Sequence, residues 1–125
     1  MSTEQDQMYA DIFTTAIEGG VNYWASVLSY KWTLPNSEQD LVGFRAVVID
    51  QEEDGAEPQT IDRAVIVRGV REMSAMKFNP GSQAARCSKN CTALSFGRNL
   101  DDLDFDADDA DMIVQAGLFG EVVYG

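Results

Sequence analysis

Histidine is absent from the 125 residues of this sequence, and its absence removes several kinds of chemistry. Histidine is the usual general base near neutral pH and the partner of the nucleophile in Ser-His and Cys-His couples. It is also a common ligand of zinc. An enzyme is therefore not the favoured class, and the sequence leads us to assign no catalytic residue, no metal and no cofactor.

Cysteine is scarce as well. Cys87 and Cys91 are the only two, and they lie four residues apart in the polar stretch CSKNC. Two thiolates without histidine do not complete a tetrahedral zinc site. We expect two reduced cysteines in an intracellular chain, while a local disulfide and a zinc ion shared between two copies of the chain are the alternatives.

Long apolar runs are missing too. No stretch of roughly eighteen apolar residues occurs, and no basic segment followed by an apolar one opens the chain, so we expect neither a membrane span nor a signal peptide. Hydrophobic residues make up 45% of the chain, which is enough for one modest core. The sequence therefore predicts a single cytoplasmic domain, residues 1–125, and a small chain with exposed aromatics is compatible with a homodimer.

Positive charge is also in short supply. The 9 lysine and arginine residues face 21 acidic ones, which gives a net charge of -12. Such a surface repels nucleic acid and anionic lipid, so we expect no direct binding to either. Two interpretations stay open: the charge keeps the protein soluble, including at high salt, or it attracts a basic protein by occupying a groove that normally holds DNA phosphates.

Hydrophobic periodicity predicts the elements of the N-terminal half. Apolar residues recur at three- and four-residue intervals between Met8 and Trp24, which predicts an amphipathic helix over about residues 6–23. Alternation over residues 26–33 and a β-branched run over residues 41–50 predict two strands of an antiparallel hairpin.

The C-terminal half is less regular. Residues 60–76 fit both a strand and a helix, and we predict a helix capped by Thr60. Residues 79–103 contain several turn signals, which predict a long irregular segment. Asp106 is predicted to cap a last helix, with EVVYG after it as a short strand or tail. The predicted fold is α+β, about three helices packed on a small antiparallel sheet.

An acidic run covers residues 101–111. Its alternating aspartates resemble a calcium loop, but Asp109 stands where such a loop needs glycine and Gln115 where it needs glutamate. We expect helix capping and a solvated acidic face that binds the partner, and a bound divalent metal is the alternative. The acidic face consists of Asp101, Asp102, Asp104, Asp106, Asp108, Asp109 and Asp111.

The stretch AIEGGVNYWASVLSYKW crowds glycines, aromatics and a carboxylate into residues 16–32. Its aromatics either belong to the core or line a small-molecule pocket. In the pocket hypothesis, Arg68 and Arg71 lie one helical turn apart and bind an anionic group, whereas ion pairing with nearby acids is the alternative. The candidate ligand-binding residues are Glu18, Asn22, Tyr23, Trp24, Arg68, Arg71, Gln115 and Glu121.

Three segments carry a resemblance to a known family: EGGVNYW, VRGVREM and DADMIVQAGLFGEVVYG. Together they resemble a widespread, largely uncharacterised family of small tailed-bacteriophage proteins, while residues 79–100 match nothing in it. The resemblance implies a phage accessory protein whose two terminal motifs meet. The matching residues are Glu18, Gly19, Gly20, Tyr23, Trp24, Arg68, Gly69, Phe119, Gly120, Glu121, Val123, Tyr124 and Gly125.

Three functions are compatible with these patterns. The favoured one is a phage-encoded, non-enzymatic protein that interferes with a host process, in host takeover or counter-defence. Its acidic face would bind a basic host protein, one that handles nucleic acid if the face mimics DNA. The first alternative sequesters a nucleotide-like molecule between aromatics and arginines. The second is a metal-dependent enzyme of phosphate chemistry, with Glu18 and Glu121 or the aspartates as ligands.

Gly20 offers a test of contact between the first and last helices. A glycine inside a helix costs about 1 kcal/mol relative to alanine, and close approach of another backbone would compensate for that cost. The variant Gly20→Val should then lose about 1–3 kcal/mol or more through overpacking, measured by urea denaturation. A loss below about 0.5 kcal/mol, as at an ordinary surface position, would exclude the contact.

Overall fold

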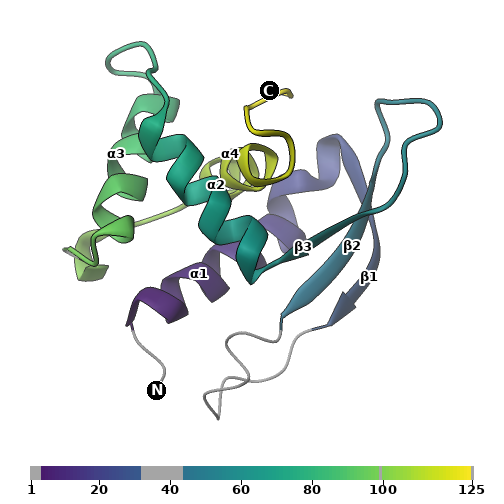
Figure 1. Ribbon diagram of the computed structural model, residues 1–125, viewed down its shortest axis with the longest axis horizontal. Helices are drawn as coiled ribbons and strands as arrows, with labels where there is room; N and C mark the ends of the chain where they lie inside the picture. The colour runs from purple at the N-terminus through teal and green to yellow at the C-terminus, as the bar shows by residue number, and fades with distance from the viewer. Residues whose placement is uncertain (1–3, 32–43, 99, 125) are drawn as a thin grey trace.

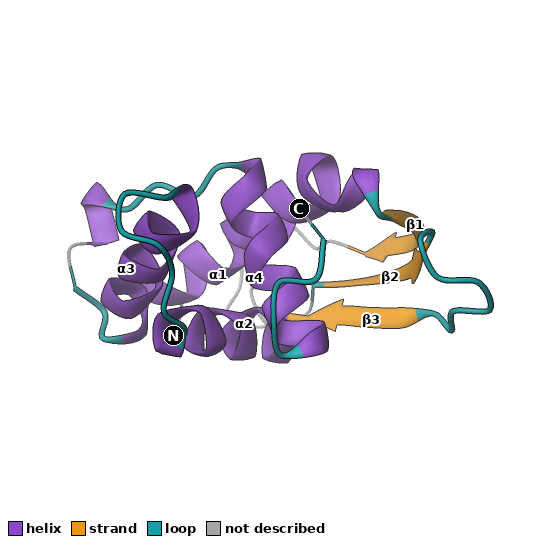
Figure 2. Ribbon diagram, turned by 90° about the horizontal axis from the view of Figure 1, so that it is seen from above, coloured by secondary structure: helices purple, strands orange, loops and turns teal. Residues whose placement is uncertain are grey.

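The computed structural model describes residues 4–31, 44–98 and 100–124. The described residues form an α+β fold with an antiparallel sheet, as predicted, and they contain four α-helices rather than about three. The helices gather at one end of an elongated molecule and the strands at the other (Figures 1 and 2). Within the described parts, no helix is both long and apolar enough to cross a bilayer.

The N-terminal helical segment consists of three consecutive parts. The α-helix α1, Glu4–Thr15, continues into a π-helical turn, Ala16–Gly20, and a 3-10 turn, Val21–Tyr23. The N–H of Val21 bonds to the carbonyl of Ala16, five residues back, which is the wide turn of a π-helix. The prediction of one helix over residues 6–23 is confirmed in extent, although its last turns depart from α geometry.

The wide turn brings Gly20 against the last helix. A Cβ at Gly20 would lie 2.8 Å from the carbonyl oxygen of Ala107, whereas a Cβ at Gly19 would meet the Ala107 Cβ at 3.9 Å, an ordinary contact. The predicted approach of the first and last helices is therefore confirmed at Gly20.

The sheet has the strand order β1-β2-β3, with β1 at Ala25–Lys31, β2 at Arg45–Asp50 and β3 at Gln59–Asp62. Both neighbouring pairs are antiparallel, and the β1–β2 pairing is irregular between Val27 and Ser29. The predicted hairpin is confirmed for these residues, while the predicted strand ends at residues 32–33 and 41–43 lie outside the described residues.

The helix predicted over residues 60–76 begins later than expected. Thr60 belongs to β3, where it pairs with Val47, and α2 spans Arg63–Ala75. Asp62 is the N-cap, because its side chain accepts a hydrogen bond from the N–H of Val65. The prediction of Thr60 as the cap was wrong, since the segment first pairs as a strand and then turns into the helix.

The prediction of a long irregular segment over residues 79–103 was also wrong. The helix α3, Gln83–Ser95, occupies its centre and is capped by the Ser82 side chain. Its buried side chains are Cys87, Cys91 and Leu94, which recur at intervals of four and three. The two cysteines therefore supply the apolar face of a helix whose other residues are mostly polar, and that polarity hid the periodicity.

The last helix, α4, spans Ala107–Phe119 and begins at Asp106, as predicted. Asp106 and Asp109 form a reciprocal capping box, and Gly120 ends the helix with a left-handed φ of 79°. Residues 121–124 that follow form no strand.

The closest packing in the described core joins α2 to α4 (Figure 1). A Cβ at Gly69 would lie 1.9 Å from the carbonyl oxygen of Ile113, and a Cβ at Gly117 would lie 2.2 Å from that of Val65. The two glycines thus let each helix approach the backbone of the other. At Gly117 the neighbour of α4 is therefore α2.

Alanine substitutions should separate tight from open glycine positions. Gly69→Ala should cost about 3 kcal/mol or more, because the new methyl group overlaps a backbone that cannot move alone. Gly19→Ala is the matched control and should be neutral or stabilise by up to about 1 kcal/mol. Urea denaturation midpoints measure both changes, and equal costs at the two positions would contradict the described α2–α4 packing.

Candidate functional site

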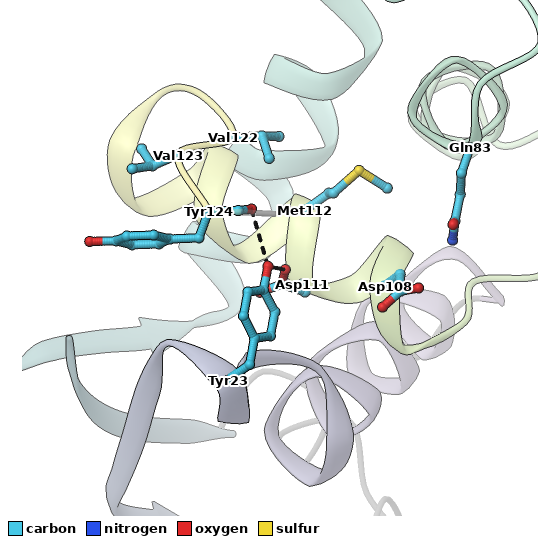
Figure 3. Close-up of a pocket in the computed structure, with 8 residues that line it drawn as sticks. All are labelled: Tyr23, Gln83, Asp108, Asp111, Met112, Val122, Val123 and Tyr124. Atoms are coloured by element: carbon cyan, nitrogen blue, oxygen red, sulfur yellow. Dashed lines mark hydrogen bonds between the residues drawn. The ribbon is translucent and has the colours of Figure 1, made fainter. Parts of the chain in front are cut away.

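A buried carboxylate lies where the end of the first helical segment meets α4. Asp111 on α4 is 3% exposed. Its Oδ1 accepts a hydrogen bond from Trp24 Nε1 at 2.6 Å. Its Oδ2 accepts one from the Tyr23 hydroxyl at 2.5 Å, which Figure 3 shows. Gln115 Nε2 donates a third at 2.8 Å. A buried carboxylate is costly unless its oxygens are paired, and three donors satisfy that requirement here.

Gln115 holds the C-terminal segment against α4. Its Oε1 accepts hydrogen bonds from the backbone N–H groups of Val123 at 2.8 Å and Tyr124 at 2.6 Å. Its Nε2 also lies 3.0 Å from the Tyr124 carbonyl oxygen. One buried amide therefore replaces the strand partner that this segment lacks.

The Tyr124 side chain extends the contact to the sheet. Its ring stacks on the indole of Trp24, with centroids 5.3 Å apart and an interplanar angle of 21°. Its hydroxyl donates a hydrogen bond to Asp50 at the end of β2. Residues from the first helical segment, the sheet, α4 and the C-terminal segment thus share one network.

The protonation states of the network follow from its surroundings. Burial raises the pKa of Asp111, and the hydrogen bonds from Tyr23, Trp24 and Gln115 offset part of that rise. Burial and the hydrogen bond to Asp111 raise the pKa of Tyr23 to about 12. The hydrogen bond to Asp50 chiefly raises the pKa of Tyr124 to about 12. Both phenols therefore stay protonated near neutral pH and act as donors.

A pocket of about 640 Å³ opens on the solvent side of this network (Figure 3). The aromatic side chain of Tyr23, the apolar groups of Met112 and the carboxylate of Asp108 border it. The two acidic side chains that line the pocket are Asp108 and Asp111, and no lysine or arginine among the described residues lines it. The pocket therefore does not suit a nucleotide-like anion. The full lining is Tyr23, Gln83, Asp108, Asp111, Met112, Val122, Val123 and Tyr124.

The structure brings together only some of the predicted ligand-binding residues. Tyr23, Trp24 and Gln115 meet at Asp111, but Trp24 is 1% exposed and belongs to the core, so its ring offers no free stacking surface. Trp32 lies outside the described residues. The other predicted polar residues are exposed and do not line the pocket, namely Glu18, Asn22 and Glu121.

The two arginines of the predicted anion site do not border the pocket either. Arg68 donates a hydrogen bond from Nε to the Gly117 carbonyl oxygen at 2.7 Å, near the end of α4. Burial raises the pKa of Tyr9, and the positive charge of Arg71 offsets part of that rise. Arg68 therefore stabilises the α2–α4 contact.

The predicted acidic face is smaller than expected. Asp109 and Asp111 are buried, because one closes the capping box and the other pairs with the aromatics, so their inclusion in the face was wrong. The face as observed is joined by acids of α1: Glu4 borders a hollow with Asp101, and Asp11 borders another with Asp104. The exposed members of the predicted set are Asp101, Asp102, Asp104, Asp106 and Asp108.

Cys87 and Cys91 are free and buried on α3, with their Sγ atoms 4.0 Å apart. Hydrogen bonding to Cys91 and burial raise the pKa of the Cys87 thiol. Among the residues that the structure describes, no group of three or more His, Cys, Asp or Glu side chains is arranged to hold a metal ion.

Comparisons with protein-family models, curated proteins and solved structures give no match. Functional hypotheses for this chain therefore rest on its own residues. Sequence reasoning missed Asp50 and the central position of Asp111. The usable signal was a carboxylate and an amide four residues apart, Asp111 and Gln115, within the otherwise apolar stretch DMIVQAG of one helix.

Replacing Gln115 tests how the C-terminal segment is held. Gln115→Leu replaces the amide by an apolar side chain of similar size and leaves the N–H groups of Val123 and Tyr124 unpaired, so we expect a stability loss of about 2–4 kcal/mol. Hydrogen exchange at these two amides should become at least about tenfold faster.

Gln83→Leu is the control for this experiment, because its amide bonds only to Asp106 and Asp109 in the described structure. It should leave the exchange of Val123 and Tyr124 unchanged. Full protection of both amides in Gln115→Leu would show that another contact holds the segment.

Proposed function

We propose that this chain is a phage-encoded binding protein without enzymatic activity, which interferes with a host process by binding a basic host protein. The bound surface is the acidic face at the start of α4, together with the neighbouring acids of α1. The partner handles nucleic acid if this face takes the place of DNA phosphates. Host takeover and counter-defence are the two settings in which such blocking acts.

One observation carries this proposal: among the described residues, no lysine or arginine pairs with several exposed carboxylates of the acidic face. In the described part of the chain an ion pair joins Arg63 to Asp6, whereas no lysine or arginine there lies within ion-pair distance of Asp101, Asp104 or Asp108. Like charges held close together repel, and the repulsion is relieved when a basic surface binds them.

The geometry supports an extended contact. Asp101 and Asp104 border hollows shared with α1, while Asp108 borders the large pocket beside Tyr23. Met8 borders both hollows, so the acids of α1 and those of residues 101–104 lie beside one another. A basic partner gains orientation from such a pattern as well as a faster encounter.

A second acidic segment provides an internal reference. Glu52, Glu53, Asp54 and Glu57 are exposed between β2 and β3, at the sheet end of the molecule (Figure 2). They carry as many charges as Asp101, Asp102, Asp104 and Asp108. The number of charges therefore does not distinguish the two segments. A partner that binds specifically must distinguish them by the arrangement of the charges.

Capture from a bacterial lysate tests the proposal. The immobilised protein should retain a basic protein at about 0.1 M salt and release most of it at about 0.5 M, because screening shortens the reach of the charges. Neutralising Asp101, Asp102, Asp104 and Asp108 to asparagine should reduce capture at least about tenfold.

The charge-matched control neutralises Glu52, Glu53 and Glu57 to glutamine and Asp54 to asparagine, and it should keep full capture. Thermal unfolding confirms that both variants are folded. If both variants lost the same amount of captured protein, net charge alone would explain the binding and the acidic face would not be the site. If the unmodified chain captured no basic protein, the proposal would be wrong.

A further inference from the structure

The pocket beside Tyr23 combines features that suit one class of chemical group. We propose that it receives the side chain of a lysine or arginine of the partner, with the cationic head near Asp108 and the aliphatic stem against Met112 and Val123. This inference rests on the proposed function and identifies the point at which the basic partner is anchored.

The charge of the pocket selects a cation. Its two carboxylates are Asp108 and Asp111, and no lysine or arginine among the described residues borders it. Asp111 is buried and already accepts three hydrogen bonds. It therefore adds negative electrostatic potential to the pocket but offers the ligand no free acceptor oxygen. Asp108 is exposed and is hydrogen-bonded to no described side chain, so its carboxylate is free to pair with a ligand.

The apolar wall suits the stem of a long basic side chain. Met112 and Val122 are partly buried, while Val123 is 50% exposed and Tyr23 is 53% exposed. In Figure 3 the Met112 side chain extends over the space between the C-terminal segment and Gln83, with the Asp108 carboxylate below it. The methylenes of lysine or arginine bury well against such groups while the charge stays near water.

Tyr23 adds a further reason for a cation. Its half-exposed ring borders the pocket, and a ring face attracts ammonium and guanidinium groups. Its hydroxyl is engaged with Asp111, which fixes the position of the ring. The volume of about 640 Å³ is within the range of ordinary ligand sites, so one side chain fits together with bridging water.

The position of Asp108 favours a protein as the source of the cation. Asp108 belongs both to the pocket and to the acidic face, so a side chain entering the pocket comes from a molecule that also covers the face. A basic protein surface meets both requirements at once. The pocket then anchors one residue and the face steers the rest.

Nuclear magnetic resonance titrations with small probes test the pocket directly. The probes are the blocked amino acids N-acetyl-lysine methylamide and N-acetyl-arginine methylamide, with the neutral citrulline derivative as the uncharged counterpart. The two cationic probes should shift the Trp24 indole N–H and the Met112 and Val123 amides in a saturable manner. The citrulline derivative should not.

Variants of equal charge locate the effect. Asp108→Asn should weaken binding of the cationic probes at least about threefold, while Asp54→Asn in the β2–β3 loop removes the same charge and should leave it unchanged. Equal shifts with citrulline, equal weakening in both variants, or no saturable shift would each overturn the inference.

The probe titration and the lysate experiment separate the two proposals. If a basic protein is captured through the acidic face but Asp108→Asn alone captures as much and the probes give no shift, the pocket inference falls and the proposed function stands. If the probes bind in the pocket but no basic protein is captured, the cation site stands and the proposed function falls.

Discussion

The burial of Asp111 is the constraint on which the rest of this structure depends. A carboxylate inside a small protein needs donors, and here they come from Tyr23, Trp24 and Gln115. Those donors belong to segments far apart in the sequence. Satisfying one charge therefore fixes the first helical segment against α4, and through Gln115 it also fixes the C-terminal segment.

The network also determines what is left for function. Trp24 stacks on Tyr124 and donates a hydrogen bond to Asp111, so its ring is buried in the core. Tyr23, by contrast, keeps about half of its surface exposed. The same hydrogen bonds form the floor of the pocket and leave Asp108 as its free charge. A structural requirement thus creates a negatively charged, partly aromatic surface that continues into the acidic face.

Sequence patterns predicted those elements whose local signals agree with their tertiary role. The amphipathic N-terminal helix, the hairpin and the Asp106 cap are examples, since periodicity and capping act within a few residues. The helix α3 was missed because its buried face is formed by cysteines in a polar segment, and β3 because pairing with β2 overrides a helical pattern.

The candidate site was predictable only in part, for a related reason. The resemblance to a known family implied that the two terminal motifs meet, but hydrogen bonds between distant residues leave no periodic trace in the sequence. Burial of Asp111 and the orientation of Tyr124 depend on the packed structure. Arg68 likewise has the side chain expected in an anion site. It contacts a backbone carbonyl instead, and that contact exists only because α2 packs on α4.

A double-mutant cycle tests most directly whether the Asp111 network acts as one unit. Tyr23→Phe removes the hydroxyl, and Gln115→Leu removes the amide, that both donate a hydrogen bond to Oδ2 of Asp111. Unfolding free energies of the two single variants and the double variant give their coupling. The account predicts a coupling of about 1–2 kcal/mol, and additivity within about 0.3 kcal/mol would contradict a shared network.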